Sequence, residues 1–270
     1  MDEVTKKVLE FYKMMPFNIY EDLDKACNNI ISNPLYNTYP FLKENLFKSK
    51  NILDVGCGGG WIVNNIGYHL KNKQITGIDI NPVAVNFGQQ ISKKLKNEVN
   101  FKVMDLFDYK EKHHDFIISM GVLHHTKDCL KALNHVCAIG SKGTVIYIGL
   151  YHKVSRKPFL DFVNSLNNLD ENQKFQRYKE LHKLTDEKHL KSWFRDQVLH
   201  PHETQHTLSE VLNIFKKNNY EFSGTSINHF KEEDMEVIQK KEKELIEYAR
   251  EKIEKKIYYP GFFITAGIKK

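Results

Sequence analysis

The sequence predicts an α/β fold in which a doubly wound sheet carries helices on both faces. Three observations predict it: short apolar runs rich in Ile and Val recur along the chain, helix-like or turn-like segments separate them, and a glycine-rich loop follows the first run. Continuous apolar runs are typical of parallel strands that are buried on both faces. Strands that alternate with helical segments imply right-handed crossovers between parallel strands.

Seven segments have the composition of strands. Five of them alternate with helical or turn-like segments, at residues 51–55, 74–80, 99–104, 115–120 and 144–150. Two further strands are predicted after a long polar stretch, at residues 221–227 and 261–268. The repeated βα pattern makes the first five strands the scaffold of the domain.

Helices are predicted from their start signals and from their charge. Pro82 after Asn81 occupies a tolerated first-turn position and opens a helix behind the second strand. Thr207 followed by Glu210 has the order of a capping box, so a helix is expected to start there. The charged stretch 230–256 is predicted as a solvent-facing helix.

Composition excludes several protein classes. The chain has 270 residues, of which 41% are hydrophobic and 27% charged, unlike disordered, collagen-like or membrane-spanning proteins. The formal net charge of +6 is spread along the chain, so nucleic acid is not an expected partner. The four cysteines lack the spacing of a zinc site or a disulfide framework, and no apolar run approaches the about 18 residues of a membrane span. We expect a cytoplasmic protein with reduced thiols and no membrane partner, whose oligomeric state is left open.

A glycine-rich loop directly follows the first predicted strand, in the order Asp54-Val55-Gly56-Cys57-Gly58-Gly59-Gly60. Glycine lets backbone approach a ligand closely, and the helix behind the loop presents free N–H groups. Such a loop at the carboxyl end of a strand is where open α/β sheets bind nucleotides. The dinucleotide pattern G-x-G-x-x-G fails here, because Trp61 stands where its third glycine is required.

The spacing Asp54-x-Gly56-x-Gly58-x-Gly60 resembles the first motif of the class I S-adenosylmethionine-dependent methyltransferases. Four more segments are similar to elements of that family in the same order, at residues 77–81, 103–106, 115–125 and 143–148. The match covers roughly residues 48–152. The resemblance implies a Rossmann-like sheet of seven strands and S-adenosyl-L-methionine as cofactor, with S-adenosyl-L-homocysteine as product.

The resemblance also implies which residues bind the cofactor. The glycines line its methionine part, Asp79 accepts from the ribose hydroxyls, and Asp105 accepts from the adenine amino group. Asp54 is expected to hold the glycine loop through backbone N–H groups. The predicted cofactor-binding residues are Asp54, Gly56, Cys57, Gly58, Gly60, Asp79, Ile80, Asp105, Leu106, Met120 and His125.

Three histidines are candidates for proton transfer. His124 and His125 stand beside the expected position of the transferred methyl group, and His152 follows the fifth strand. Histidine titrates near physiological pH, which suits a general base. Methyl transfer depends mostly on positioning, however, and needs a base only when the acceptor carries its proton at neutral pH. A packing role is the other interpretation of each histidine, and both stay open.

The polar stretch 153–207 is predicted to be an insertion after the fifth strand, helical in parts and irregular over residues 193–203. Its dense polar residues are expected to bind the acceptor, and the alternative is a surface loop with internal ion pairs. Two arginines are candidates to bind an anionic group on the acceptor. The predicted acceptor-binding residues are Tyr12, Phe17, Tyr20, Tyr151, Arg156, Arg195, His200, His202 and Glu203.

The segment His202-Glu203-Thr204-Gln205-His206 matches the zinc-protease pattern H-E-x-x-H, which needs both histidines on one helix. We reject a zinc site, because the capping box starts its helix only at Thr207. No metal is expected in this protein.

The aromatic-rich N-terminal segment, residues 1–48, is predicted to be a helical lid over a methyltransferase domain at residues 49–270. Lids of this kind exclude water from the reaction, whereas plain packing against the sheet is the alternative. A lid and an insertion enclose a pocket, which favours a small-molecule acceptor. The alternatives are an RNA or protein methyltransferase, or a non-catalytic cofactor-binding or partner-binding module of the same fold.

Overall fold

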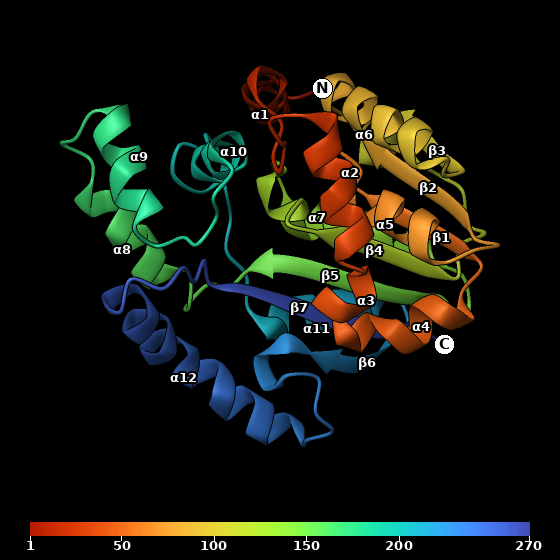
Figure 1. Ribbon diagram of the computed structural model, residues 1–270. Helices are drawn as coiled ribbons and strands as arrows, with labels where there is room; N and C mark the ends of the chain where they lie inside the picture. Colours follow the sequence, from red (N-terminus) through yellow and green to blue (C-terminus); the bar gives the residue numbers. More distant parts are fainter.

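The computed structural model describes residues 1–270 and confirms the predicted α/β sheet (Figure 1). Seven strands form one sheet in the order β3-β2-β1-β4-β5-β7-β6. The first five strands pair in parallel, and β7 runs antiparallel to both β5 and β6. The strand order reverses at β1, which is the position where open sheets of this kind bind their ligands.

Each strand begins and ends within two residues of its predicted bounds. The strands are β1 Asn51–Val55, β2 Gln74–Asp79, β3 Val99–Val103, β4 Phe116–Met120, β5 Val145–Tyr151, β6 Tyr220–Thr225 and β7 Phe262–Lys269. The predicted end of β6 instead forms a short 3₁₀ helix, Ser226–Asn228. Every residue of β5 is buried, as expected for a strand covered on both faces.

Helices cover both faces of the sheet and close two apolar cores. One face carries α4 (Lys43–Lys48), α5 (Trp61–His69) and α6 (Pro82–Leu95). On the other face α7 (Cys129–Ile139) packs against α11 (Leu208–Lys217). Neighbouring strand residues divide between these cores, since side chains along a strand point alternately to opposite faces.

The N-terminal segment is helical. It forms α1 (Glu3–Met14), α2 (Leu23–Ser32), α3 (Leu35–Thr38) and α4. The second helix packs against α5 and α6, where its Ala26, Cys27 and Ile30 form a small core with Ile91. The first helix contacts α6 and lies near α10 at the end of the sheet (Figure 1). The domain boundary at residue 48 stays a prediction.

The segment after β5 contains three helices and a separate small core. These are α8 (Lys157–Ser165), α9 (Glu171–Lys179) and α10 (Glu187–Val198), which project beyond the end of β5 (Figure 1). The prediction of irregular chain over 193–203 is wrong for its first half, because α10 continues to Val198. Leu190 and Phe194, one helical turn apart, are both buried there and hold α10 against α9.

The predicted charged helix is α12 (Met235–Glu254), which packs along α8. It is mostly exposed, and Ile238 and Ala249 are its buried residues. None of the helices in the chain combines the length and the apolar character that crossing a membrane requires.

The capping box that starts α11 is confirmed. The Thr207 hydroxyl accepts from the N–H of Glu210, and the Glu210 carboxylate accepts from the N–H of Thr207 at 2.8 Å. Two N–H groups that lack partners within the helix are thereby satisfied.

Replacing this cap tests its contribution to stability. We expect Thr207→Ala to lower the free energy of unfolding by about 1 kcal/mol, the usual cost of losing an N-cap side chain. Urea unfolding measures the change, and Thr38→Ala at an exposed position of α3 is the matched control. Equal losses in the two variants would contradict the assignment.

Candidate functional site

The predicted cofactor residues meet at the carboxyl edge of the parallel strands. The glycine loop follows β1, Asp79 ends β2, Asp105 follows β3 and Met120 ends β4. Because these strands are neighbours in the sheet, the four positions lie along one edge. Helix α5 begins directly after the loop and points its N-terminus at the same edge.

The glycine loop combines left-handed backbone with close packing. Gly56, Gly58 and Gly60 have φ values of +79°, +50° and +75°. A Cβ on Gly56 would lie 2.3 Å from Cγ1 of Val122, and one on Gly60 would lie 2.8 Å from Phe101. A Cβ on Gly58 would meet nothing within 4 Å. Gly56 and Gly60 therefore allow Val122 and Phe101 to pack closely against the loop, whereas Gly58 faces open space that a ligand can fill.

Two acidic side chains stand at this loop without a basic partner. Asp79 accepts from the N–H groups of Gly58 and Asn81, each at 2.8 Å, so it links the loop to the end of β2. Asp54 is buried, and burial together with the charge of Asp79 raises the pKa of its carboxyl to about 8. Burial also raises the pKa of Asp79. Neither forms an ion pair with a Lys, Arg or His, so this part of the edge favours a cation.

The remaining predicted cofactor residues lie on the same edge. Asp105 caps a short 3₁₀ helix by accepting from the N–H of Phe107 at 3.0 Å, and Leu106 begins that helix. Ile80 and Met120 are half-buried. Cys57 is buried, which raises the pKa of its thiol, and its N–H donates to the carbonyl of Ile78.

A buried polar cluster lies where α1, β5 and α10 meet. Asp196 accepts from the hydroxyls of Tyr12 and Tyr151 and from the amide of Gln197. Nε2 of His125 lies 3.9 Å from Oδ1 of the same carboxylate. Tyr12 also connects to the cofactor edge, because its carbonyl accepts from the side chain of Asn81 at 3.0 Å.

Arg156 and Glu203 form a buried ion pair beside this cluster. Nε and Nη2 of Arg156 donate to the two carboxylate oxygens of Glu203 at 3.0 and 2.6 Å, and Nη1 donates to Gln197 and to the carbonyl of Pro260. The guanidinium lies 3.7 Å from the ring centroid of Tyr151. Because its donors are engaged within the chain, Arg156 does not present a free cation to a ligand. Its geometry contradicts the predicted role in binding an anion.

Four histidines surround the cluster. His124 stacks on Tyr151 with ring centroids 4.0 Å apart, and His125 lies over His200 at 3.8 Å. Nδ1 of His125 bonds to the carbonyl of His202 at 2.9 Å, and Nε2 of His202 bonds to the carbonyl of Thr126 at 3.1 Å. The chain from His202 to His206 is not helical, as the rejection of the zinc-protease pattern required.

The other predicted residues divide between this cluster and its surroundings. His152 is fully buried and pairs with Glu242 at 2.9 Å, while its Nδ1 accepts from backbone N–H groups, so its bonds favour a structural role. Phe17 lies against Trp193, and Tyr20 stacks on His189, both on α10. The Arg195 guanidinium lies over the ring of Phe11, and its buried Nε has no hydrogen-bond partner.

Three residues of the site escaped the sequence-based prediction. Gln197 joins Arg156 to Asp196, Asn81 joins Tyr12 to the end of β2, and Val122 fills the space over Gly56. Asn81 is two residues beyond Asp79, so its position directly after the second strand could have predicted that it lies at the same edge of the sheet. Nothing local marks Val122, because Gly56 is distant in sequence, and although Gln197 follows Asp196, its other partner Arg156 lies 41 residues away.

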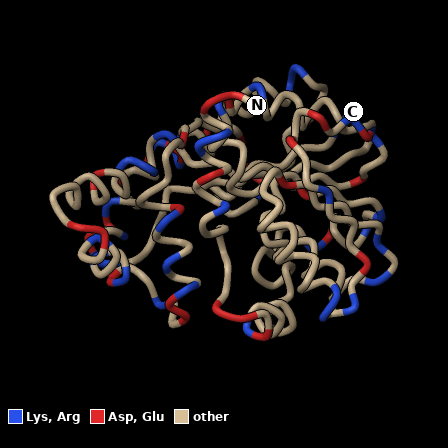
Figure 2. Tube along the Cα trace, turned by 90° about the horizontal axis from the view of Figure 1, so that it is seen from above, with Lys and Arg blue, Asp and Glu red and all other residues tan.

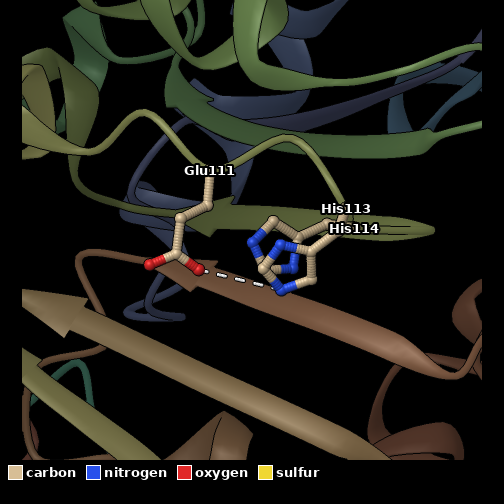
Figure 3. A group of neighbouring side chains, drawn as sticks. All are labelled: Glu111, His113 and His114. Atoms are coloured by element: carbon tan, nitrogen blue, oxygen red, sulfur yellow. Dashed lines mark ion pairs between the residues drawn. The ribbon is translucent and has the colours of Figure 1, made fainter.

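A second group of titratable residues lies at the opposite edge of the sheet. Glu111, His113 and His114 have ligand atoms within 4.8 Å of one another (Figure 3). Glu111 already accepts from Lys102 and from the hydroxyl of Tyr109, and the latter also contacts His114. Two surface hollows of about 270 and 480 Å³ adjoin this group. Neither hollow contains a predicted site residue, and the carboxyl edge remains the candidate site because its loop and acids converge there.

Comparison with known proteins agrees with this geometry. A family model described as a methyltransferase domain matches residues 46–262. Malonyl-[acyl-carrier protein] O-methyltransferase 1 of Ilyobacter polytropus is 29% identical over 141 residues, which is 52% of this chain and 51% of that protein. The tRNA U34 carboxymethyltransferase of Campylobacter fetus is 29% identical over 160 residues, covering 52% and 54% of the two chains. The chain therefore spans about half the length of these curated relatives.

Solved structures extend the likeness over the whole chain. The plantazolicin methyltransferase BpumL, in complex with a pentazolic desmethylPZN analogue and SAH, has a TM-score of 0.53. The match covers 99% of this chain and 96% of that one at 18% identity. At that identity, the likeness shows the fold alone.

The buried Asp54 gives the unliganded protein a defined pH dependence. Its folded pKa of about 8 exceeds the usual 3.8, so its contribution to stability is full below pH 3.8 and is lost as pH rises through 8. We therefore expect wild-type protein to lose stability over this range relative to Asp54→Asn, whose side chain does not titrate. Urea unfolding of both proteins at a series of pH values measures the difference. A difference that stays constant with pH would contradict the raised pKa.

Proposed function

Because the chain belongs to the family of methyltransferase domains, we propose that it transfers the methyl group of S-adenosylmethionine to a small-molecule acceptor by in-line displacement. The observation that carries the proposal is the carboxyl edge itself. An open glycine loop and two acids without basic partners converge there.

The charge of this edge suits the proposed cofactor. S-adenosylmethionine carries a sulfonium and an ammonium group, and a cation bound beside Asp54 and Asp79 would favour the ionised forms of these two carboxyls, whose pKa values burial raises. Gly58 leaves space above the loop, and each oxygen of Asp79 keeps a second lone pair for ribose hydroxyls. Asp105 and the N–H of Leu106, after β3 on the same edge, would bind the adenine in this proposal. These are the residues that would hold the cofactor.

The N-terminal segment supports a small acceptor. Tyr12 is bonded both to Asn81 at the cofactor edge and to Asp196 of α10, so α1 covers the space between them. We propose that residues 1–48 act as a lid over the domain of residues 49–270, and that the 153–207 segment forms the other wall. An enclosed space of this kind suits a small molecule better than a polymer.

Surface charge supports the same choice. Lys and Arg are interspersed with Asp and Glu along the trace in the view of Figure 2. Nucleic-acid-binding surfaces gather basic residues on one face. The likeness to a tRNA-modifying enzyme keeps an RNA acceptor as the alternative to be tested.

An anionic group on the acceptor would meet Arg195 in this proposal. Its Nε is buried without a hydrogen-bond partner, whereas Arg156 is engaged by Glu203. We further propose a reducing, cytoplasmic location, which the four free and buried cysteines support.

Loss of the Asp79 carboxylate should weaken cofactor binding. Asp79→Ala removes the acceptor for the ribose hydroxyls, and we expect S-adenosylmethionine to bind roughly 5- to 150-fold more weakly. Calorimetric titration with S-adenosylmethionine and S-adenosylhomocysteine measures the change. Gly58→Asp, which places a side chain in the open space of the loop, should abolish binding. Asp234→Ala, at the start of α12, is the matched control. Unchanged affinity in a folded Asp79→Ala protein would refute its role.

An RNA acceptor predicts a different salt dependence. If the acceptor is a small molecule, methyl transfer should be insensitive to added polyanions such as heparin and only weakly dependent on salt. RNA binding would instead fall steeply with salt, because counterions are released from the backbone. If heparin inhibits methyl transfer by competing with the acceptor, the acceptor is RNA rather than a small molecule.

A further inference from the structure

Three imidazole nitrogens of the polar cluster, Nε2 of His124, His125 and His200, are buried without hydrogen-bond partners. Two of them belong to the closest pair of rings. They are Nε2 of His125 and Nε2 of His200, on rings whose centroids are 3.8 Å apart. Buried polar atoms in native proteins are paired in the great majority of cases. A ligand is therefore expected to supply the partner of each.

The bonds of the other ring nitrogens determine which of these atoms carries a proton. Nδ1 of His125 lies 2.9 Å from a carbonyl oxygen, which can only accept, so Nδ1 holds the proton and Nε2 is an acceptor. Nδ1 of His200 accepts from the backbone N–H of His202 at 3.1 Å, so Nε2 of the neutral ring is a donor. Burial lowers the pKa of both rings, to about 2 for His200, which keeps them neutral.

We propose that this acceptor and donor pair receives a hydroxyl group of the methyl acceptor, with His125 as general base and His200 as the orienting donor, so that the reaction is O-methylation. The inference rests on the proposed function, because it assigns the acceptor side of the same site.

A hydroxyl fits the pair better than other nucleophiles. It has one proton for Nε2 of His125 and two lone pairs, one for the N–H of His200 and one for attack. A neutral amine has a single lone pair, which cannot both accept from His200 and attack. A thiol is a weak acceptor, and a carboxylate has no proton to offer His125. Only the hydroxyl satisfies both nitrogens and keeps a lone pair free.

The transfer balances with these groups. The acceptor oxygen forms a bond to the methyl carbon, and the bond between that carbon and sulfur breaks with its electron pair left on sulfur. The hydroxyl proton passes to Nε2 of His125. The resulting imidazolium lies 3.9 Å from the Asp196 carboxylate, which stabilises its charge before the proton leaves to solvent.

Groups on several elements act on the His125 ring. Burial, the largest effect, and the positive charge of Arg156 lower the pKa of His125, whereas Asp196 of α10, the carbonyl of His202 and Glu203 favour its charged form. Tyr12 of α1 and Tyr151 of β5 face the ring edge-on, with pKa values that burial raises well above normal, so both stay neutral donors. Asp196 has the largest effect among the groups that favour protonation of His125 during transfer.

The first test reads the tautomers directly. In the 270-residue protein labelled with ¹⁵N at histidine and saturated with S-adenosylhomocysteine, NMR distinguishes protonated from bare imidazole nitrogens. We expect His125 to carry its proton on Nδ1 and His200 on Nε2. His113 and His114 at the opposite edge serve as internal references. The reverse tautomer of either ring in the cluster overturns the proposal.

The second test adds phenol as a probe, because the rings of Phe11 and Tyr12 beside His200 suit a flat apolar carrier. Phenol should shift the Nε2 resonances of His125 and His200 but not those of His113 and His114, and toluene, which lacks the hydroxyl, should shift none. His200→Phe keeps a ring and loses the donor, so phenol should bind roughly five- to tenfold more weakly. Phenol that leaves both Nε2 resonances unmoved overturns the proposal.

Cofactor binding separates the two possible failures. If S-adenosylhomocysteine does not bind the folded protein, the proposed function fails. If it binds to wild type and to His200→Phe alike while the tautomers or the phenol shifts disagree, only the hydroxyl proposal fails.

Discussion

The contact between Gly56 and Val122 fixes the geometry on which the whole site depends. A side chain at Gly56 would occupy the space of the Val122 methyl groups, and its left-handed backbone disfavours any other residue. The loop after β1 therefore packs closely against the loop after β4. Val122 leads directly into the short helix that carries His124 and His125. The imidazoles are consequently held at a constant position relative to the glycine loop.

The edge proposed to bind the cofactor and the cluster proposed to bind the acceptor differ in charge, and this difference suits them to different tasks. The cofactor side has Asp54 and Asp79 without basic partners, so it favours a cationic ligand. On the acceptor side the one fully buried guanidinium is neutralised by Glu203, and burial keeps the surrounding imidazoles uncharged. A neutral imidazole is the form that can take a proton. The side proposed for the acceptor is thus suited to proton transfer.

The sequence predicted what depends on local pattern and missed what depends on distant partners. Apolar runs located all the strands, and the hydroxyl and acid of the capping box located the start of α11. The second half of α10 was predicted as irregular chain because it is rich in polar residues. Asp186 at the N-cap and the four-residue spacing of Leu190 and Phe194 nevertheless indicate a helix. Residue type and position in the sequence identified the candidate residues, but they did not identify the hydrogen bonds and ion pairs that these residues form.

Those bonds could not be predicted because they join segments far apart in the chain. The sequence predicts Arg156 as a free cation, whereas the fold pairs it with Glu203, 47 residues away. In the sequence Tyr12 is one aromatic residue among several, whereas in the fold its hydroxyl donates to Asp196, 184 residues away. Composition and spacing show which groups a chain carries, whereas the fold determines which of them are already engaged.

Tyr12 joins the two sides of the site into one unit. Its carbonyl accepts from Asn81, next to the residues expected to hold the cofactor, and its hydroxyl donates to Asp196, which faces His125. A movement of α1 away from the sheet would break both bonds together. It would leave Asp196 with one donor fewer and expose the imidazoles that Tyr12 covers. In the proposed lid, access to the acceptor and order at the cofactor-binding edge would therefore be coupled through a single residue, which would help to exclude water.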